Sequence, residues 1–128
     1  MATRGVGIDV VDVERFALAI ERHPALVGRL FTDAEQRDAS SRPERLAARF
    51  AAKEAVLKTL HVGVGATSWH SIEIHRDPSG APSVRLHGSA AALAHDRGVS
   101  ALHLSMTHTR LSAAAVVVAS DDGAVDAG

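Results

Sequence analysis

Residues 45–60 read RLAARFAAKEAVLKTL, and this stretch decides the fold. Most of its residues are good helix formers, and neither glycine nor proline interrupts them before Gly63. A start signal for a helix stands just upstream, formed by Ser41, Pro43 and Glu44. The sequence therefore predicts a long helix, against which the rest of the chain has to pack.

Two sides of this predicted helix carry different chemistry. Glu54 and Lys58 lie one turn apart, where such a pair is ordinarily a surface ion pair worth roughly a few tenths of a kcal/mol. The other interpretation is that both side chains face a functional site. Lys53 falls near the centre of the apolar stripe, and the sequence offers no reason for a lysine there. That stripe, at helical spacing, is formed by Leu46, Phe50, Leu57 and Leu60.

Residues 5–13, GVGIDVVDV, form a β-branched run that predicts a buried strand with two glycines near its start. Asp9 lies inside this run, between Ile8 and Val10. A carboxylate in a buried strand has to be paired, metal-bound or protonated, because burying it alone costs roughly several kcal/mol. A structural ion pair and a strand whose Asp9 face is wet are the alternatives to a metal site. Asp12 is interpreted as a strand-end residue.

The remainder of the chain alternates short helices with paired strands. We expect helices at 14–22, from Thr32 with a capping box to Glu35, and at 89–98, and strands at 69–75, 83–87, 101–108 and 111–120. Because these strands come mostly in adjacent pairs without crossover helices, the pattern favours an α+β fold with a mainly antiparallel sheet and packed helices. It also predicts one domain over residues 1–120 and a frayed, disordered tail over 121–128.

Composition narrows the classes of function. The 128 residues are 46% hydrophobic but include only three Phe, one Trp and no Tyr, so the core is built from small aliphatic side chains and gains from burial against other subunits. The absence of cysteine excludes disulfides, thiolate zinc sites and nucleophilic thiols. A formal net charge of −1 argues against nucleic-acid binding. No signal or membrane-spanning segment is evident, so we expect a cytoplasmic protein without a membrane partner.

Acidic and basic residues supply the candidate chemistry. If Asp9 and Glu54 face one site, their oxygens suit Mg²⁺, which takes one or two carboxylates together with substrate phosphates, and Lys58 would meet a phosphate oxygen. His108 ends an apolar strand face, and it either borders that site or is a structural histidine. Gly65, in a G-x-G loop, would let backbone amides approach phosphates. No nucleophile elbow, Walker loop or dinucleotide fingerprint occurs, which removes support for those classes.

Two blocks of the sequence carry a resemblance to a known family. One block is Gly7-Ile8-Asp9 running into Val13-Glu14-Arg15, and the other is the helix R-F-A-x-K-E-A-x-x-K from Arg49 to Lys58. With both blocks at this spacing, the chain resembles the acyl-carrier-protein synthases, the small phosphopantetheinyl transferases of bacterial fatty-acid synthesis, over roughly residues 4–119. The resemblance implies a 4′-phosphopantetheinyl transferase fold that assembles as a homotrimer with active sites at the subunit interfaces. Further likenesses are at Gly63 to Gly65, Trp69 to Ile74, Gly80 to Pro82 and Ser105 to His108.

The same resemblance implies a role for each candidate residue. Asp9 and Glu54 would hold Mg²⁺ against the pyrophosphate of coenzyme A, Lys58 would contact that phosphate, and His108 would come from the neighbouring subunit. The family often has an acidic residue directly after this strand-end histidine, but here Thr109 follows His108. This departure puts in doubt any role for a carboxylate at position 109. Contacts to the coenzyme A phosphates or nucleotide are implied at Arg45, Arg49, Gly65, Ser105 and Thr109. The residues implied to face the acidic helix of the carrier protein are Arg15 and Arg22.

The function implied is Mg²⁺-dependent transfer of 4′-phosphopantetheine from coenzyme A to a serine of apo acyl carrier protein, with adenosine 3′,5′-bisphosphate as the second product. A metal-bound water or one of the two carboxylates would take the serine proton. The alternative is a non-catalytic coenzyme A or nucleotide-binding assembly domain on the same scaffold, against which the intact Asp9, Glu54 and Lys58 argue. The sequence leaves open which carrier protein is the substrate and whether acylated coenzyme A is accepted.

Overall fold

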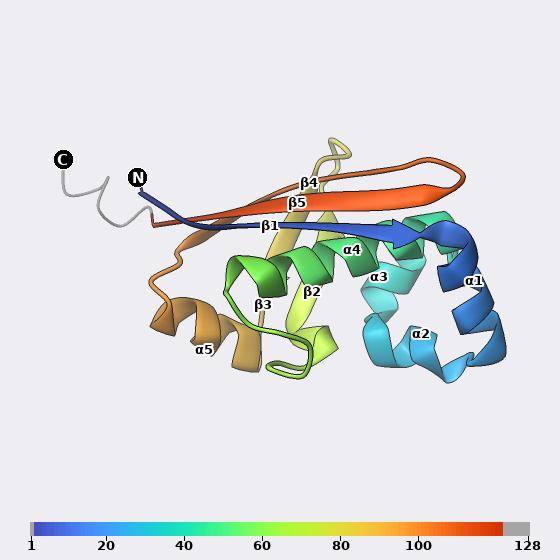
Figure 1. Ribbon diagram of the computed structural model, residues 1–128, viewed down its shortest axis with the longest axis horizontal. Coiled ribbons are helices and arrows are strands. Elements are labelled where there is room, and N and C mark those ends of the chain that lie inside the picture. Colours follow the sequence, from blue (N-terminus) through green and yellow to red (C-terminus); the bar gives the residue numbers. More distant parts are fainter. Residues whose placement is uncertain (1, 122–128) are drawn as a thin grey trace.

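The computed structural model describes residues 2–121 (Figure 1). The strands form two antiparallel sheets, one of three strands in the order β1-β5-β4 and one hairpin of β2 and β3. The α+β prediction is confirmed, although two sheets stand where one was expected. None of the helices within 2–121 is long and apolar enough to cross a membrane. The elements are β1 (Ala2–Asp12), α1 (Val13–Arg22), α2 (Ala25–Leu30), α3 (Asp33–Asp38), α4 (Pro43–Thr59), the 3₁₀ turn η1 (Trp69–Ser71), β2 (Ile72–Arg76), β3 (Pro82–Leu86), α5 (Gly88–Asp96), β4 (Ala101–His108) and β5 (Ser112–Asp121).

Helix α4 is the element around which the others are arranged. It contacts all three strands of the larger sheet as well as α1 and β2. Figure 1 shows the sheet on one side of α4, helices α1 to α3 around one end and α5 toward the other. Eleven of its 17 residues are buried, and five of those eleven are alanines. The predicted long helix is therefore confirmed, and its small side chains let its backbone come close to its neighbours.

The register of β1 separates the two faces of the larger sheet. Gly7 lies opposite Val117 of β5, and both are buried on the face toward α4. On the other face Val6, Ile8 and Val10 are 59%, 62% and 65% exposed. The prediction of a buried strand is therefore wrong for one face of β1. The reason is that a sheet covered by helices on one side only buries every second side chain.

Strand β1 and helix α4 are in direct backbone contact at two glycines. A Cβ at Gly7 would overlap the carbonyl oxygen of Ala55, and a Cβ at Gly5 would overlap that of Thr59. The Thr59 hydroxyl also donates to the carbonyl of Val117 at 3.0 Å, which connects α4 to β5. Because no side chain separates the two backbones, the residues that follow Gly7 on β1 lie close to those beside Ala55 on α4.

A buried ion pair holds another side of α4. Lys53 is 0% exposed, and its Nζ donates to Glu35 Oε1 at 2.7 Å and to the carbonyl oxygens of Leu30 and Trp69 at 2.8 and 2.9 Å. The Glu35 carboxylate also accepts the backbone N–H of Ile74 at 2.9 Å. All three ammonium protons of Lys53 are thus paired, which offsets the cost of burying the charge. The lysine that the sequence pattern left unexplained joins α2, α3, η1 and β2 to α4.

The three Phe and the single Trp of the chain gather in one cluster beside this ion pair. The ring centroids are 6.3 Å apart for Phe16 and Phe31, 5.6 Å for Phe16 and Phe50, and 5.4 Å for Phe50 and Trp69. These separations are typical of favourable aromatic pairs. The cluster concentrates the few large side chains where α1, α4 and η1 meet, while the rest of the core is aliphatic.

Several local predictions are confirmed and others need correction. Thr32 and Glu35 form the predicted capping box of α3, and Asp12 ends β1 and caps α1 by accepting the Arg15 N–H at 2.9 Å. Helix α2 was not predicted, because its six residues are too few to show a helical period. The cap of α4 is Arg42 rather than Ser41, whose φ of +52° lies in the left-handed region.

Three boundaries also differ from the prediction. Residues Trp69–Ser71 form a 3₁₀ turn, so the strand expected at 69–75 begins only at Ile72. Helix α5 runs from Gly88 to Asp96, so it begins one residue before and ends two residues before the expected range 89–98. Asp121, expected in the tail, is the last residue of β5 and pairs with Arg4 at 2.9 Å. The rest of the expected tail, 122–128, lies outside the described residues.

Glu73 of β2 collects three side-chain hydrogen bonds at the surface of the hairpin. Its carboxylate accepts from Thr32 Oγ1 at 2.7 Å, His75 Nε2 at 2.7 Å and His87 Nε2 at 3.2 Å. Burial raises the pKa of Glu73, but the hydrogen bonds from Thr32, His75 and His87 outweigh it and lower the pKa to about 2. The ionised carboxylate therefore stabilises the attachment of the hairpin to the loop before α3.

The glycine contact predicts opposite effects for two Gly→Ala substitutions. Gly7→Ala should lower the free energy of unfolding by about 1–3 kcal/mol, because the new methyl group forces α4 away from β1. Gly28→Ala is the matched control: it lies in α2 with no atom within 4 Å of its added Cβ, and it should stabilise by about 0.4–1 kcal/mol. Urea unfolding followed by circular dichroism measures both. Equal stability of Gly7→Ala and wild type would show that the contact is loose.

The Glu73 network predicts a specific loss of stability in acid. Because the pKa of Glu73 falls from 4.5 to about 2 on folding, its contribution is full above about pH 4.5 and disappears as the pH falls toward 2. Glu73→Gln should therefore lower stability at pH 6 by roughly 1 kcal/mol, after allowance for solvent screening, and flatten the wild-type decline below pH 4.5. Glu21→Gln, at an exposed position of α1, is the control. Parallel wild-type and Glu73→Gln curves would contradict this role.

Candidate active site

Strand β1 and helix α4 bring Asp9, Glu54 and Lys58 together, as the sequence predicted. Asp9 lies two residues after Gly7 on the face toward α4, and Glu54 stands beside Ala55. Lys58 Nζ donates to Asp9 Oδ1 at 3.0 Å and to the Ile8 carbonyl at 2.9 Å. The Asp9 side chain is 14% exposed and that of Lys58 51%, so the pair lies at the rim of the protein rather than inside it. Asp9 and Glu54 both line a hollow of about 360 Å³.

The two carboxylates of this hollow act on each other electrostatically. Burial raises the pKa of Glu54, the negative charge of Asp9 raises it further, and Lys58 opposes both effects. The charge of Lys58 thus balances the two acids only in part, and a further cation bound beside them would stabilise the ionised form of Glu54.

Asp9 and Glu54 fit a hard divalent cation whose other coordination positions are filled by water and substrate oxygens. Within residues 2–121 no group of three or more His, Cys, Asp or Glu side chains could hold a metal ion. Mg²⁺ commonly takes one or two carboxylates and completes its shell with water and phosphate oxygens, which is what Asp9 and Glu54 offer.

The remaining walls of the hollow come from the end of β1 and from α1 and α4. Arg15, in the first turn of α1, lines it together with the rings of Phe16 and Phe50. Arg22 is exposed at the end of the same helix, two turns from Arg15, and does not line the hollow. The exposed Leu18 lies between the two arginines along α1. The helix therefore presents a basic and partly apolar side next to the carboxylates.

His108 and Arg45 belong to a second hollow, of about 220 Å³. It is lined by Arg45, Ala48, Arg76, Met106, Thr107 and His108, and it shares no lining residue with the first. The single chain thus does not bring His108 to Asp9 and Glu54. Arg49, also predicted to contact coenzyme A, is 1% exposed and donates from Nη1 to the carbonyl of Arg45 at 3.2 Å.

The other predicted residues are dispersed. Ser105 lies on the outer face of the sheet, where it lines a shallow hollow of about 150 Å³ with Ile8 and Val116. Gly65 has a φ of +96° in an exposed loop and no atom within 4 Å of a would-be Cβ. Thr109 holds the β4–β5 turn, because its Oγ1 accepts the N–H groups of Leu111 at 3.2 Å and Ser112 at 3.1 Å. These three positions do not form one site within a chain.

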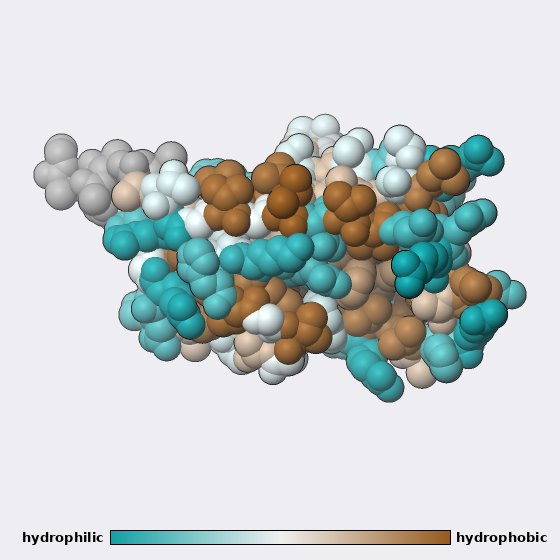
Figure 2. Space-filling view, viewed as in Figure 1, coloured by the Kyte–Doolittle hydropathy of each residue, from teal (hydrophilic) through white to brown (hydrophobic). Residues whose placement is uncertain are grey.

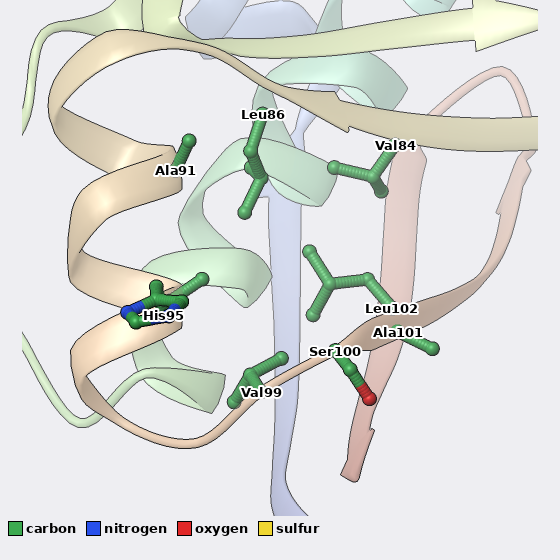
Figure 3. Close-up of a pocket in the computed structure, with 9 residues that line it drawn as sticks. Val84, Leu86, Ala91, His95, Val99, Ser100, Ala101 and Leu102 are labelled. Atoms are coloured by element: carbon green, nitrogen blue, oxygen red, sulfur yellow. The ribbon is translucent and has the colours of Figure 1, made fainter. Parts of the chain in front are cut away.

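A further hollow of about 270 Å³ contains none of the predicted residues. Figure 3 shows it between α5, β3 and β4, with Val84, Leu86, Val99 and Leu102 directed toward one another and His95 on the α5 side. It lies between α5 and strands of the two sheets and takes no part in the arrangement around Asp9.

Two residues of the site region were missed by the sequence reasoning. Arg76 lines the hollow of His108 but stands in the sequence as an ordinary arginine at the end of a strand, with no motif around it. Lys53 positions α4, and its signal was visible, because a lysine at the centre of an apolar stripe needs a buried acid. Its partner Glu35 was recognised only as part of a capping box.

Comparisons with known proteins cover almost the whole chain. Residues 5–116 match the family described as the 4′-phosphopantetheinyl transferase superfamily. The holo-[acyl-carrier-protein] synthase of Clavibacter sepedonicus is 52% identical over 122 residues, which cover 94% of this chain and 98% of that protein.

Solved structures agree with this match. The holo-[acyl-carrier-protein] synthase of Neisseria meningitidis superposes with a TM-score of 0.84 at 31% identity, covering 94% of this chain and 100% of that one. The enzyme of Helicobacter pylori in complex with coenzyme A gives a TM-score of 0.82 at 30% identity, covering 90% of this chain and 99% of that one. Fold, paired carboxylates and sequence lead to one conclusion: this chain belongs to the 4′-phosphopantetheinyl transferase superfamily, among the holo-[acyl-carrier-protein] synthases.

Proposed function

We propose that this protein transfers 4′-phosphopantetheine from coenzyme A to a serine of apo acyl carrier protein, releasing adenosine 3′,5′-bisphosphate. The observation that carries the proposal is the hollow in which Asp9 and Glu54 oppose each other beside Lys58. Similar proteins named holo-[acyl-carrier-protein] synthase, one of them with coenzyme A bound, support the substrate pair.

Asp9 and Glu54 are the residues that would hold Mg²⁺. When bound, Mg²⁺ neutralises the charge of the coenzyme A pyrophosphate and orients it. Two observations support Mg²⁺ at this position. The carboxylates of Asp9 and Glu54 converge, and burial and the charge of Asp9 raise the pKa of Glu54. A carboxylate pair with a nearby lysine suits a phosphate-bearing substrate that arrives together with a cation.

The side chains of the hollow stabilise the leaving group and accept the proton in an in-line phosphoryl transfer. The carrier serine Oγ forms a bond to the β-phosphorus while the bond from that phosphorus to the bridging oxygen breaks, and the nucleotide leaves with the electron pair. Lys58 Nζ, already within 3.0 Å of Asp9, donates to the leaving phosphate and stabilises its charge. The serine proton passes to a base in the hollow, whose lining acids are Asp9, Asp12 and Glu54.

We infer that the working protein is a homotrimer, as the family resemblance implies. The support from the structure is the exposed apolar face of β1 formed by Val6, Ile8 and Val10. Figure 2 shows apolar surface gathered over this strand. The register sets these residues opposite Val118, Val116 and Ala114 of β5, so the apolar face is two strands wide.

Assembly through this face explains why one chain holds its predicted site residues in two separate hollows. If His108 reaches the carboxylate hollow from the neighbouring subunit, Arg45 comes with it, since both line the same hollow. One subunit then supplies Asp9, Glu54 and Lys58, and the next supplies His108 and Arg45. Ser105 lies on the face that would be covered.

Helix α1 is the proposed docking surface for the carrier protein. Arg15 and Arg22 are exposed two turns apart, with Leu18 44% exposed between them, so α1 offers two positive charges around an apolar contact. This suits an acidic helix with an apolar stripe. Because Arg15 also lines the carboxylate hollow, a carrier bound here has its serine close to the reacting phosphate. We place the reaction in the cytoplasm and in fatty-acid synthesis, as the resemblance implies.

Thr109 does not favour the non-catalytic alternative. Its hydroxyl accepts two backbone N–H groups in the β4–β5 turn, which a short acidic side chain at this position would also do. The departure from the family pattern thus keeps the turn that places His108.

Glu54→Gln separates catalysis from folding. Transfer should fall at least about 100-fold, because the amide no longer binds a cation or stabilises the transition state. Stability should be equal or higher, since the pKa of Glu54 is raised by burial and by Asp9, so its charge destabilises the folded state at neutral pH. Intact-mass spectrometry of apo acyl carrier protein with coenzyme A and Mg²⁺ measures transfer, and thermal unfolding measures stability.

The matched control is Glu44→Gln, in the first turn of the same helix and paired only with Arg42 at the surface. It should transfer like wild type. Wild-type transfer by Glu54→Gln would overturn the assigned role of Glu54. Absence of transfer by the wild-type protein to several apo carriers would overturn the proposed function itself.

Val6→Lys tests the proposed assembly. A charge on the apolar face of β1 should convert the trimer to a monomer and reduce transfer, because each site then lacks the neighbour's half. Light scattering after size exclusion measures the mass, with Leu18→Lys, at an exposed leucine on α1, as the control that leaves the mass unchanged. A monomeric wild type, or a trimeric Val6→Lys, would refute the interface.

A further inference from the structure

Lys53 and Glu35 are two buried charges that the proposed chemistry does not use. Both are 0% exposed, and the Lys53 ammonium is held by Glu35 Oε1 and by the carbonyl oxygens of Leu30 and Trp69 at 2.7, 2.8 and 2.9 Å. A buried ion pair often adds little net stability, because desolvation of the two charges offsets their attraction. The pair therefore calls for a role other than stability, and the direction of its bonds supplies one.

The other contacts of α4 leave its rotation poorly defined near Lys53. Its buried face is rich in alanine, and single methyl groups form only shallow ridges against neighbouring elements. The contact of Gly7 with the Ala55 carbonyl sets how close β1 and α4 come, but it opposes rotation little, because backbone atoms lie close to the helix axis. The hydroxyl of Thr59 holds the last turn through the Val117 carbonyl. At the turn that carries the site, the three directional bonds of Lys53 fix the rotation.

A small rotation of α4 is enough to separate the two carboxylates of the hollow. Glu54 follows Lys53 by one residue, so the two side chains leave the helix about 100° apart. The Glu54 side chain ends roughly 5–6 Å from the helix axis, and a turn of about 10° therefore moves its end by roughly 1 Å. A displacement of about 1 Å in a catalytic site can lower the rate about 100-fold.

Resting on the proposed function, we propose that Lys53 is a positioning residue that fixes the rotation of α4 and so sets Glu54 opposite Asp9. It takes no part in the chemistry, since its ammonium is enclosed and all three of its protons are already paired. The aromatic wall of the hollow depends on the same anchor. Phe50 lines the hollow and packs on Trp69, whose carbonyl binds Lys53.

A double-mutant cycle of Asp9→Asn and Glu54→Gln, measured by thermal unfolding without metal or coenzyme A, tests this placement. In the wild-type background either substitution removes the same repulsion, so their effects on Tm should not add. In a Lys53→Met/Glu35→Gln background neither buried charge is left without its partner, and Glu54 is free to turn away from Asp9. The two effects should then add.

Transfer to the carrier gives the second readout. For Lys53→Met/Glu35→Gln, kcat should fall about 100-fold while KM for the carrier protein stays unchanged, because α1 keeps its docking side chains. Glu35→Asp is the milder variant, which keeps both charges but shortens the reach of the carboxylate by one methylene. It should weaken the coupling and lower kcat about tenfold, and it decides the question if the neutral pair does not fold.

Two controls separate positioning from loss of stability and from loss of charge. Ile72→Val shortens a side chain that is 0% exposed in the core cluster containing Val56 and Leu57 of α4. It should lower Tm and leave coupling and kcat at wild-type values. Arg42→Met/Glu44→Gln neutralises a surface ion pair of 3.3 Å at the start of α4 and should likewise change neither.

Several outcomes would overturn the role of Lys53. These are equal coupling in both backgrounds, additive effects already in the wild type, wild-type kcat in Lys53→Met/Glu35→Gln and, where only Glu35→Asp folds, unchanged coupling and kcat in that variant. Because the cycle needs neither substrate nor metal, it is independent of the proposed function. A wild type that transfers nothing but shows the change in coupling refutes the function alone, whereas transfer together with unchanged coupling refutes the role of Lys53 alone.

Discussion

The contact of α4 with β1 is the constraint on which the site depends. Gly7 leaves no room for a side chain against the carbonyl of Ala55, so two backbones rather than two side chains set the separation. Asp9 follows Gly7 on the same face of the strand, and Glu54 precedes Ala55 in the helix. The opposition of these carboxylates is therefore a consequence of backbone packing. Alanines along the helix make that approach possible, as a larger side chain would hold the layers apart.

The ion pair of Lys53 and Glu35 fixes the rotation of the same helix. Its bonds span 18 and 23 residues of sequence, which is why periodicity alone could place Lys53 on the helix but could not name its partners. The sequence did predict the helix itself, the convergence of Asp9 with Glu54 and the capping box, because these follow from local pattern or from the family motif. It missed α2, which is too short to show a period, and it predicted a buried strand for β1, one face of which is exposed.

Division of the site between two hollows follows from the same architecture. The sheet has helices on one face only, so the apolar side chains of β1 and β5 on the other face are left for the proposed second copy to cover. In the proposed trimer, the residues around His108 complete the site of the neighbouring subunit. Arg49, buried without partners for two of its nitrogens, is consistent with a protomer whose charge balance is completed only with ligand.

The backbone contact of β1 and α4 also determines which parts of this protein can change during evolution. A separation set by Gly7 and Ala55 cannot be adjusted by small steps, because every residue other than glycine at position 7 collides with the helix. Mutations that alter substrate choice without loss of the carboxylate geometry are thus expected at the periphery, for example at the loop of Gly65 and the outer side of α1. The placement of the two carboxylates is inherited as a unit with the fold, whereas side chains at the periphery can change one residue at a time.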